Sequence, residues 1–266
     1  MFVRSELWAM EPNSFAGLQE FARLWGASGM EVEPRQLNRP AYRLVGGGVA
    51  IMQIRGPILK TRSLFNLYEL TTPEIRDGIR DAVANVDVKS ILFVFDTPGG
   101  AVAGASDLAN DIAAAGHVKP TAAYLEDLCA SAGYWAASQA QYIATNATGL
   151  VGCIGAYAEV VDSSGAAKEA GLKVHIIKAG AFKGAGMAGT TVTPSHLTEL
   201  QRTVNAVNDQ FTGAVHRGRK LSMRQLTAVS DGQLFVGRDA LTHKLVDAVQ
   251  SLDATVAHLV GRGSRT

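Results

Sequence analysis

The chain has very little cysteine and no excess of charge of either sign. Its 266 residues include two cysteines, and 25 lysines and arginines stand against 24 aspartates and glutamates, a formal net charge of +1. Two cysteines are too few for a disulfide framework and lack the paired spacing of a zinc site, so a reducing compartment is expected. Balanced charge argues against nucleic acid or an anionic membrane surface as a partner.

Long apolar runs are missing as well. Nowhere do about 18 apolar residues follow one another, and the N-terminus lacks the basic region and apolar stretch of a signal peptide. The six histidines are scattered, without a helical pair or a neighbouring carboxylate cluster. The sequence therefore predicts a soluble, unexported, cytoplasmic protein with no membrane anchor, no metal site and no cofactor.

What the chain does contain is an alternation of strand and helix patterns. Strands are predicted over 48–54, 90–95, 121–126, 142–145, 172–178 and 233–236, and helices over 14–26, from 72 onward, and over 105–115, 132–140 and 164–170. Such alternation indicates an α/β fold. We expect a leader (1–40) that is peripheral to the core, a main domain (41–250) and a C-terminal tail (251–266). Near the end of the main domain, two short helices are expected around the strand at 233–236.

The helix predicted from Thr193 to about Gly218 is longer than one small core needs. Its apolar stripe consists of Leu197, Leu200, Val204, Val207, Phe211 and Val215. Two explanations stay open at this point. The stripe packs along its whole length on the chain's own sheet, or the helix extends over a neighbouring subunit.

Ser131 lies in a run of small residues, Cys129–Gly133, directly before a predicted helix. Its hydroxyl is either an N-cap for the first helical amides or a nucleophile. The two roles are compatible, because the positive end of the helix and the Ala132 amide would face an oxyanion forming on an attacked carbonyl. Cys129 itself is expected to be a core residue.

Lys183 lies in Ala179–Gly189, a segment of small and apolar residues without an acidic side chain. A lysine can deprotonate a serine only where its surroundings hold the amine neutral, and the alternative is an exposed lysine in a flexible loop. No histidine lies between Ser131 and His175, which favours lysine as the base.

A turn upstream of Ser131 is the third part of the candidate site, after Ser131 and Lys183. The apolar strand pattern ends in Thr97–Gly100, where two glycines allow close backbone approach and their amides can hold an oxyanion. The alternative is an ordinary strand-to-helix turn. Together, the strand, the glycine pair, the serine and the lysine predict a peptidase.

These motifs, in this order, resemble the signal peptide peptidase A family, serine peptidases with a Clp/crotonase-type fold of repeated β-β-α units and a Ser-Lys dyad. The resemblance covers roughly Val45 to Val249 and is strongest to phage and prophage members linked to capsid maturation, which are minor capsid protein C-like. The motifs that carry it are Gly56-Pro57, Thr97–Gly100, Lys119-Pro120, Ala130–Trp135, Val151–Gly155 and Ala179–Lys183. The 52-residue separation of Ser131 from Lys183 also matches the family.

The resemblance implies a role for each site residue. The nucleophile is Ser131, the base is Lys183, and the oxyanion hole comprises the amides of Gly99, Gly100 and Ala132. Cys153 stands where the family usually carries a serine that helps to hold the lysine amine. Because a thiol is a weaker hydrogen-bond partner, Cys153 is expected to line the site and to orient Lys183 less firmly, or else to be a small buried residue.

The implied activity is hydrolysis of peptide bonds in extended polypeptides through an acyl-enzyme, with small or apolar residues near the cut. A phage scaffold or capsid protein is the expected substrate, the host cytoplasm or the phage prohead the expected place, and a homo-oligomer the expected assembly. Two alternatives stay open: a catalytically silent assembly protein, and a crotonase-type acyl-CoA enzyme, which would leave Lys183 without a role.

Overall fold

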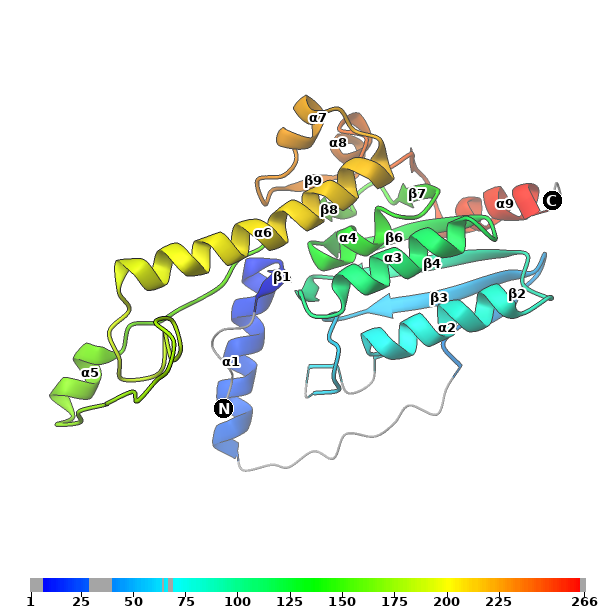
Figure 1. Cartoon of the computed structure of the whole chain (residues 1–266). Coiled ribbons are helices and arrows are strands. Elements are labelled where there is room, and N and C mark those ends of the chain that lie inside the picture. Colours follow the sequence, from blue (N-terminus) through cyan, green and yellow to red (C-terminus); the bar gives the residue numbers. More distant parts are fainter. Residues whose placement is uncertain (1–6, 29–39, 64, 67–68, 264–266) are drawn as a thin grey trace.

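The computed structural model describes residues 7–28, 40–63, 65–66 and 69–263, and a mixed sheet of eight strands forms its centre (Figure 1). Strands β10-β7-β6-β4-β3-β2 follow one another, and β8 and β9 continue from β6. They are β2 (Arg43–Val45), β3 (Val49–Arg55), β4 (Ser90–Thr97), β6 (Thr121–Ala130), β7 (Tyr142–Thr145), β8 (Leu150–Gly152), β9 (Leu234–Val236) and β10 (Ala248–Val249). The pairs β3·β4, β4·β6, β6·β7, β7·β10 and β6·β8 are parallel.

Both faces of the sheet are buried, as a mainly parallel sheet requires. Along β4, Phe93 and Phe95 belong to the larger apolar cluster, and Leu92 and Val94 to a smaller one on the other face. The larger cluster includes residues of α2 (Thr72–Ala84), α3 (Ala105–Gly116), α4 (Ala132–Ala137), α7 (Met223–Thr227) and α8 (Gly237–Thr242). The smaller cluster includes Leu259 of α9 (Leu252–Gly263), so the expected C-terminal tail contributes to the core.

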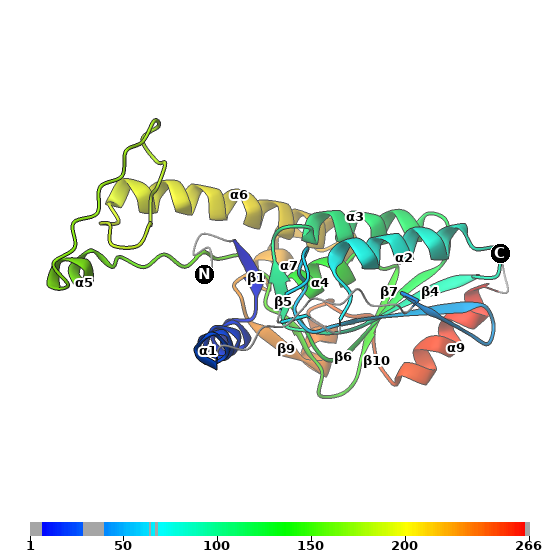
Figure 2. The ribbon, with the colours of Figure 1, turned by 90° about the horizontal axis from the view of Figure 1, so that it is seen from below.

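Helix α6 (Pro194–Arg219) packs on the body of the protein only through its C-terminal part. Its buried residues are Phe211, Ala214 and Val215, whereas Leu197 is 49% exposed. Full-length packing of the stripe on the chain's own sheet is therefore wrong for the first half of the helix. That half, α5 (Ser164–Glu169) and the segment 170–193 project from the body in both views and are called the arm here (Figures 1 and 2).

The strand predicted over 172–178 is wrong. The segment is irregular in the structure and lies in the arm, where Ile177 is 97% exposed. A strand pattern forms a strand only where another strand offers hydrogen-bond partners, and the described part of the chain places none beside this segment.

The N-terminal segment is not peripheral, contrary to expectation. Strand β1 (Trp8–Met10) pairs antiparallel with β5 (Gly99–Ala101), and Ala9 and Met10 are fully buried. The predicted helix follows as α1 (Pro12–Ser28), where Glu11 accepts hydrogen bonds from the Asn13 and Ser14 amides.

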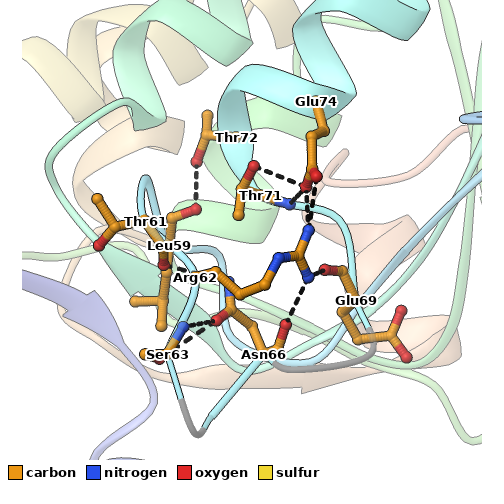
Figure 3. A network of polar contacts seen from close by, with 9 residues as sticks. All are labelled: Leu59, Thr61, Arg62, Ser63, Asn66, Glu69, Thr71, Thr72 and Glu74. Atoms are coloured by element: carbon orange, nitrogen blue, oxygen red, sulfur yellow. Dashed lines mark hydrogen bonds and ion pairs between the residues drawn. The ribbon is translucent and has the colours of Figure 1, made fainter. Parts of the chain in front are cut away.

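A polar network fixes the loop between β3 and α2 (Figure 3). The Arg62 guanidinium donates to the Glu74 carboxylate at 2.6 Å and to the Glu69 carbonyl at 2.8 Å, and Glu74 also accepts from the Thr71 amide and hydroxyl. This is a capping box at the start of α2. Nearer the start of the same loop, the Ile58 amide donates to the Gly99 carbonyl at 2.8 Å, so this loop contacts the turn at Gly99-Gly100.

The charge of Glu74 makes this network pH-dependent. Burial raises the pKa of Glu74, but hydrogen bonds from Thr71 and Arg62 outweigh it and leave the pKa below its usual range. We expect Glu74→Gln to lower the free energy of unfolding by about 2 kcal/mol at neutral pH. The difference should shrink as the pH falls below about 4.5, where Glu74 of the unfolded chain becomes protonated, and should vanish once the pH falls below the lowered pKa of the folded chain.

Urea unfolding of both chains at several pH values measures this difference. Glu20→Gln is the matched control, because Glu20 pairs with Arg23 on an exposed helix surface. Its effect should be much smaller than that of Glu74→Gln, because solvent screens an exposed ion pair. A Glu74→Gln difference that is constant between pH 7 and pH 3 would contradict the assignment.

Candidate active site

Ser131 occupies a strained turn between a strand and a helix. It follows the last residue of β6 and precedes the first residue of α4, with φ 53° and ψ −120°, a region that residues other than glycine rarely adopt. Its amide donates to the Gly152 carbonyl at 2.7 Å. Its hydroxyl makes no capping hydrogen bond to α4 and instead lies 3.4 Å from the Gly155 carbonyl. A plain N-cap role for Ser131 is therefore not what the structure shows.

The helix after Ser131 is held firmly enough to maintain this strain. The Tyr134 hydroxyl donates to the Leu245 carbonyl at 2.7 Å, and the Trp135 ring stacks on Phe211 of α6 with ring centroids 4.8 Å apart. All six residues of α4 are buried. Strained backbone conformations of this kind persist where packing over-determines them and are frequent at active sites.

The glycine turn lies directly against Ser131. A Cβ atom on Gly99 would come within 2.9 Å of the Ser131 Cβ, and Gly99 has a φ of 97°. A Cβ atom on Gly100 would lie 1.9 Å from the Ile58 carbonyl oxygen. Both positions therefore require glycine, one for its conformation and its neighbours and the other for close backbone approach.

The three expected oxyanion donors differ in their surroundings. The Gly99 amide donates to the Thr97 hydroxyl at 3.1 Å, so it already has an acceptor. The Ala132 amide is in the first turn of α4, where amides have no acceptor within the helix. Gly100 is paired with Ala9 of β1. The Ala132 amide is therefore better placed than that of Gly99 to serve a bound carbonyl, whereas Gly100 faces β1.

Cys153 lies beside Ser131, directly after the neighbouring strand β8. Ala130 pairs with Gly152, so the residues that follow them, Ser131 and Cys153, are neighbours at the ends of β6 and β8. Burial, with a smaller contribution from Glu11, raises the pKa of Cys153 to about 11 and keeps the thiol protonated at neutral pH. Cys129 is buried in the core, as expected.

Lys183 does not lie near Ser131 within one chain. It is exposed in the arm, and its neighbour Phe182 contacts His196 at the start of α6 with ring centroids 6.3 Å apart. Helix α6 reaches the body at Phe211, and the 15-residue rise from His196 corresponds to roughly 20 Å. A lysine side chain cannot span that distance.

No other base takes the place of Lys183 among the described residues. The Ser131 hydroxyl donates to a backbone carbonyl, that of Gly155, and not to a side-chain base. The described residues contain no cluster of three His, Cys, Asp or Glu side chains that could hold a metal ion. Within the same residues, no helix is both long and apolar enough to cross a membrane.

Comparison with known families identifies the chain. Residues 113–261, which include Ser131 and Lys183, match the family model of peptidase family S49. The chain belongs to peptidase family S49. The resemblance to the signal peptide peptidase A family is thereby confirmed, since members named protease 4 and signal peptide peptidase SppA are among its relatives.

Three curated relatives of this S49 chain illustrate the range of sequence identity and coverage. Capsid assembly protease C of Escherichia phage lambda is 29% identical over 89% of this chain and 54% of its own length. Putative protease MJ0651 of Methanocaldococcus jannaschii is 33% identical over 61% of this chain and 52% of its own length. Protease 4 of Salmonella typhi is 26% identical over 80% of this chain and 34% of its own length. The chain thus spans about half the length, or less, of these relatives.

A solved structure confirms the fold class. An enoyl-CoA hydratase/isomerase family protein from Silicibacter pomeroyi superimposes with a TM-score of 0.51 at 15% identity, over 85% of this chain and 82% of the other. At that identity the likeness concerns the crotonase-type fold and not the chemistry.

Sequence reasoning missed β1 as part of this region. A signal was present, because a short apolar stretch, Leu7–Met10, ends at Glu11-Pro12, where the helix begins. Four apolar residues are too few to distinguish a strand from the flank of a helix.

Proposed function

We propose that this S49 chain is a serine endopeptidase that hydrolyses peptide bonds with Ser131 as nucleophile and Lys183 as base. The observation that carries the proposal is the position of Ser131 on a strained strand-to-helix turn, in contact with the glycine turn and without a capping role. A nucleophile at such a turn lies at the carboxyl end of a strand beside backbone amides, which is the arrangement that acyl transfer needs.

The chemistry follows from these positions. The unprotonated Lys183 amine accepts the Ser131 proton as Oγ bonds to the substrate carbonyl carbon, and the carbonyl electron pair moves to the oxygen, stabilised by the amides of the Gly99-Gly100 turn and Ala132. When the intermediate collapses, the C–N bond breaks and the lysine gives its proton to the leaving nitrogen. A water molecule then repeats the sequence on the acyl-enzyme and releases the acid.

Lys183 must reach Ser131 from a second copy of the chain if the dyad is to form. Two observations support this part of the proposal. Lys183 lies in the arm next to the start of α6, and α6 rises roughly 20 Å from His196 before it reaches the body at Phe211. The arm also exposes a set of large apolar side chains, Leu172, Val174, Ile177, Phe182, Met187 and Leu197. In a homo-oligomer in which the arm of one copy covers the site of its neighbour, Lys183 would reach a Ser131 and the apolar side chains of the arm would be buried.

Processing of a phage scaffold or capsid protein, in the cytoplasm or the prohead, is the substrate assignment that the relatives favour. Two of them are named capsid assembly protease C and head-tail preconnector protein GP5. In this role Cys153 lines the site as a neutral thiol beside Ser131 and holds Lys183 less firmly than a hydroxyl would.

The experiment is cleavage of an unstructured polypeptide mixture by the native chain, with the products read by mass spectrometry. A fluorophosphonate, which reacts with activated serines, should abolish cleavage and add its mass to the peptide that contains Ser131. Cleavage that survives complete labelling of Ser131 would overturn the proposal. Absence of both cleavage and labelling in the assembled protein would favour an assembly protein without activity.

A further inference from the structure

Strand β1 lies on the edge of the glycine turn and beside a second backbone segment. Its residues Trp8, Ala9 and Met10 pair antiparallel with Ala101, Gly100 and Gly99 (Figure 2). On its other side, the amides and carbonyls of Trp8 and Tyr157 exchange two hydrogen bonds of 3.0 Å. Thus β1 fills a groove between β5 and Tyr157 with an extended chain that is paired on both sides.

The register brings the Ala9 carbonyl to the reaction centre. The Val102 amide donates to the Leu7 carbonyl and the Glu11 amide to the Pro98 carbonyl, at 3.0 and 2.7 Å. Since hydrogen-bonded pairs alternate along an antiparallel ladder, Ala9 opposite Gly100 falls on the intervening hydrogen-bonded position. The Ala9 oxygen and the Ser131 Cβ are 2.3 and 2.9 Å from the place of a Gly99 Cβ, so they lie within about 5 Å of each other.

This strand leaves the nucleophile closed. Ser131 is 1% exposed, and Ala9 and Met10 are 0% and 1% exposed. A polypeptide cannot approach the Ser131 hydroxyl through a groove that already holds a fully buried strand. Binding of another chain in the same place requires β1 to leave.

We propose that the groove between β5 and Tyr157 is the polypeptide-binding site of this chain and that β1 is its built-in occupant, a strand that a substrate must displace. The inference rests on the proposed peptidase function. The expected ligand is an extended apolar segment with a small residue at the position of Ala9, bound mainly through its backbone, as in strand addition to a sheet edge.

Aromatic contacts with α1 also hold this strand in the groove. Trp8 and Tyr157 both contact the Phe15 ring of α1, with ring centroids 4.8 and 5.6 Å apart. These contacts hold β1 at a high local concentration over the groove. The apparent affinity of a competing polypeptide is then its intrinsic affinity multiplied by the fraction of chains in which the groove is open.

The test measures binding without catalysis. All chains carry Ser131→Ala, and the probe is a fluorescent peptide with the sequence of residues 7–14, followed by anisotropy. Ala9→Trp places a large ring where no space exists and should expel β1, whereas Ala16→Trp makes the same change at an exposed position of α1. We expect the Ala9→Trp chain to bind the peptide at least about tenfold more tightly than the Ala16→Trp chain.

A second variant guards against misfolding of the first. Trp8→Pro removes the amide that donates to Tyr157 while leaving Ala9 in place, and should also open the groove. Equal affinity in the Ala9→Trp, Trp8→Pro and Ala16→Trp chains, or binding by none of them, overturns the inference. Because no hydrolysis is involved, failure of the peptidase proposal appears only in the cleavage experiment above.

Discussion

Neither Ser131→Ala nor Lys183→Ala should cleave polypeptides alone, and a mixture of the two should regain activity. Loss of the nucleophile is expected to lower kcat by roughly 10⁵- to 10⁶-fold, and loss of the base by a similar factor, because the two residues act as one unit. Recovery of activity on mixing is expected because Lys183 lies in the arm, away from the Ser131 of its own chain. If Lys183 serves the Ser131 of a neighbouring copy, some sites in a mixed oligomer combine one intact serine with one intact lysine.

The size of the recovery is a quantitative test. With equal amounts and random mixing, about a quarter of the sites contain both residues, so activity should reach about a quarter of the native value. The measurement is the rate of cleavage after the two proteins are unfolded and refolded together. Lys173→Ala, an exposed lysine in the same arm, is the control and should retain native activity. A mixture as inactive as its parts would show that the dyad does not form between copies.

The structure confirms most of what local patterns predicted. Helix α6 begins at Pro194 directly after its Thr193 cap, α2 begins one residue earlier than the Thr72-Pro73 pattern indicates, with Thr71 as its cap, and β4, β6 and β7 follow the β-branched and apolar runs. The strand-to-helix turn at Ser131 was also predictable, because small residues link an apolar strand to a helix. These features depend on a few neighbouring residues, which is why the sequence alone reveals them.

Long-range placement could not be predicted in the same way. Residues 172–178 have the composition of a strand, but their hydrogen-bond partners depend on what surrounds the arm and not on their own pattern. The position of Lys183 relative to Ser131 depends on the direction of α6, and the docking of β1 beside Gly100 joins segments about 90 residues apart. Motif order predicts the parts of the site, whereas the arrangement of α6 and β1 decides where in the fold each part lies.

Gly100→Ala should remove most activity while leaving the nucleophile and the base unchanged. The added Cβ would lie 1.9 Å from the Ile58 carbonyl oxygen and 2.6 and 2.7 Å from the Ile58 carbon and nitrogen. Backbone atoms cannot move aside as a flexible side chain can, so the turn itself must shift. The Gly100 amide then leaves the position in which it can donate to an oxyanion, and loss of one such donor lowers kcat by roughly 10²- to 10³-fold.

The comparison with Gly46→Ala separates this effect from a general cost of replacing glycine, because a Cβ at Gly46 meets nothing within 4 Å. That variant should keep native kcat and thermal stability. Fluorophosphonate labelling of Ser131 gives a second readout, since an activated serine with a displaced oxyanion donor reacts more slowly but still reacts. If a folded Gly100→Ala chain retained native kcat/KM, the stabilising amides would have to lie elsewhere, with Gly99 and Ala132 as the remaining donors of the three.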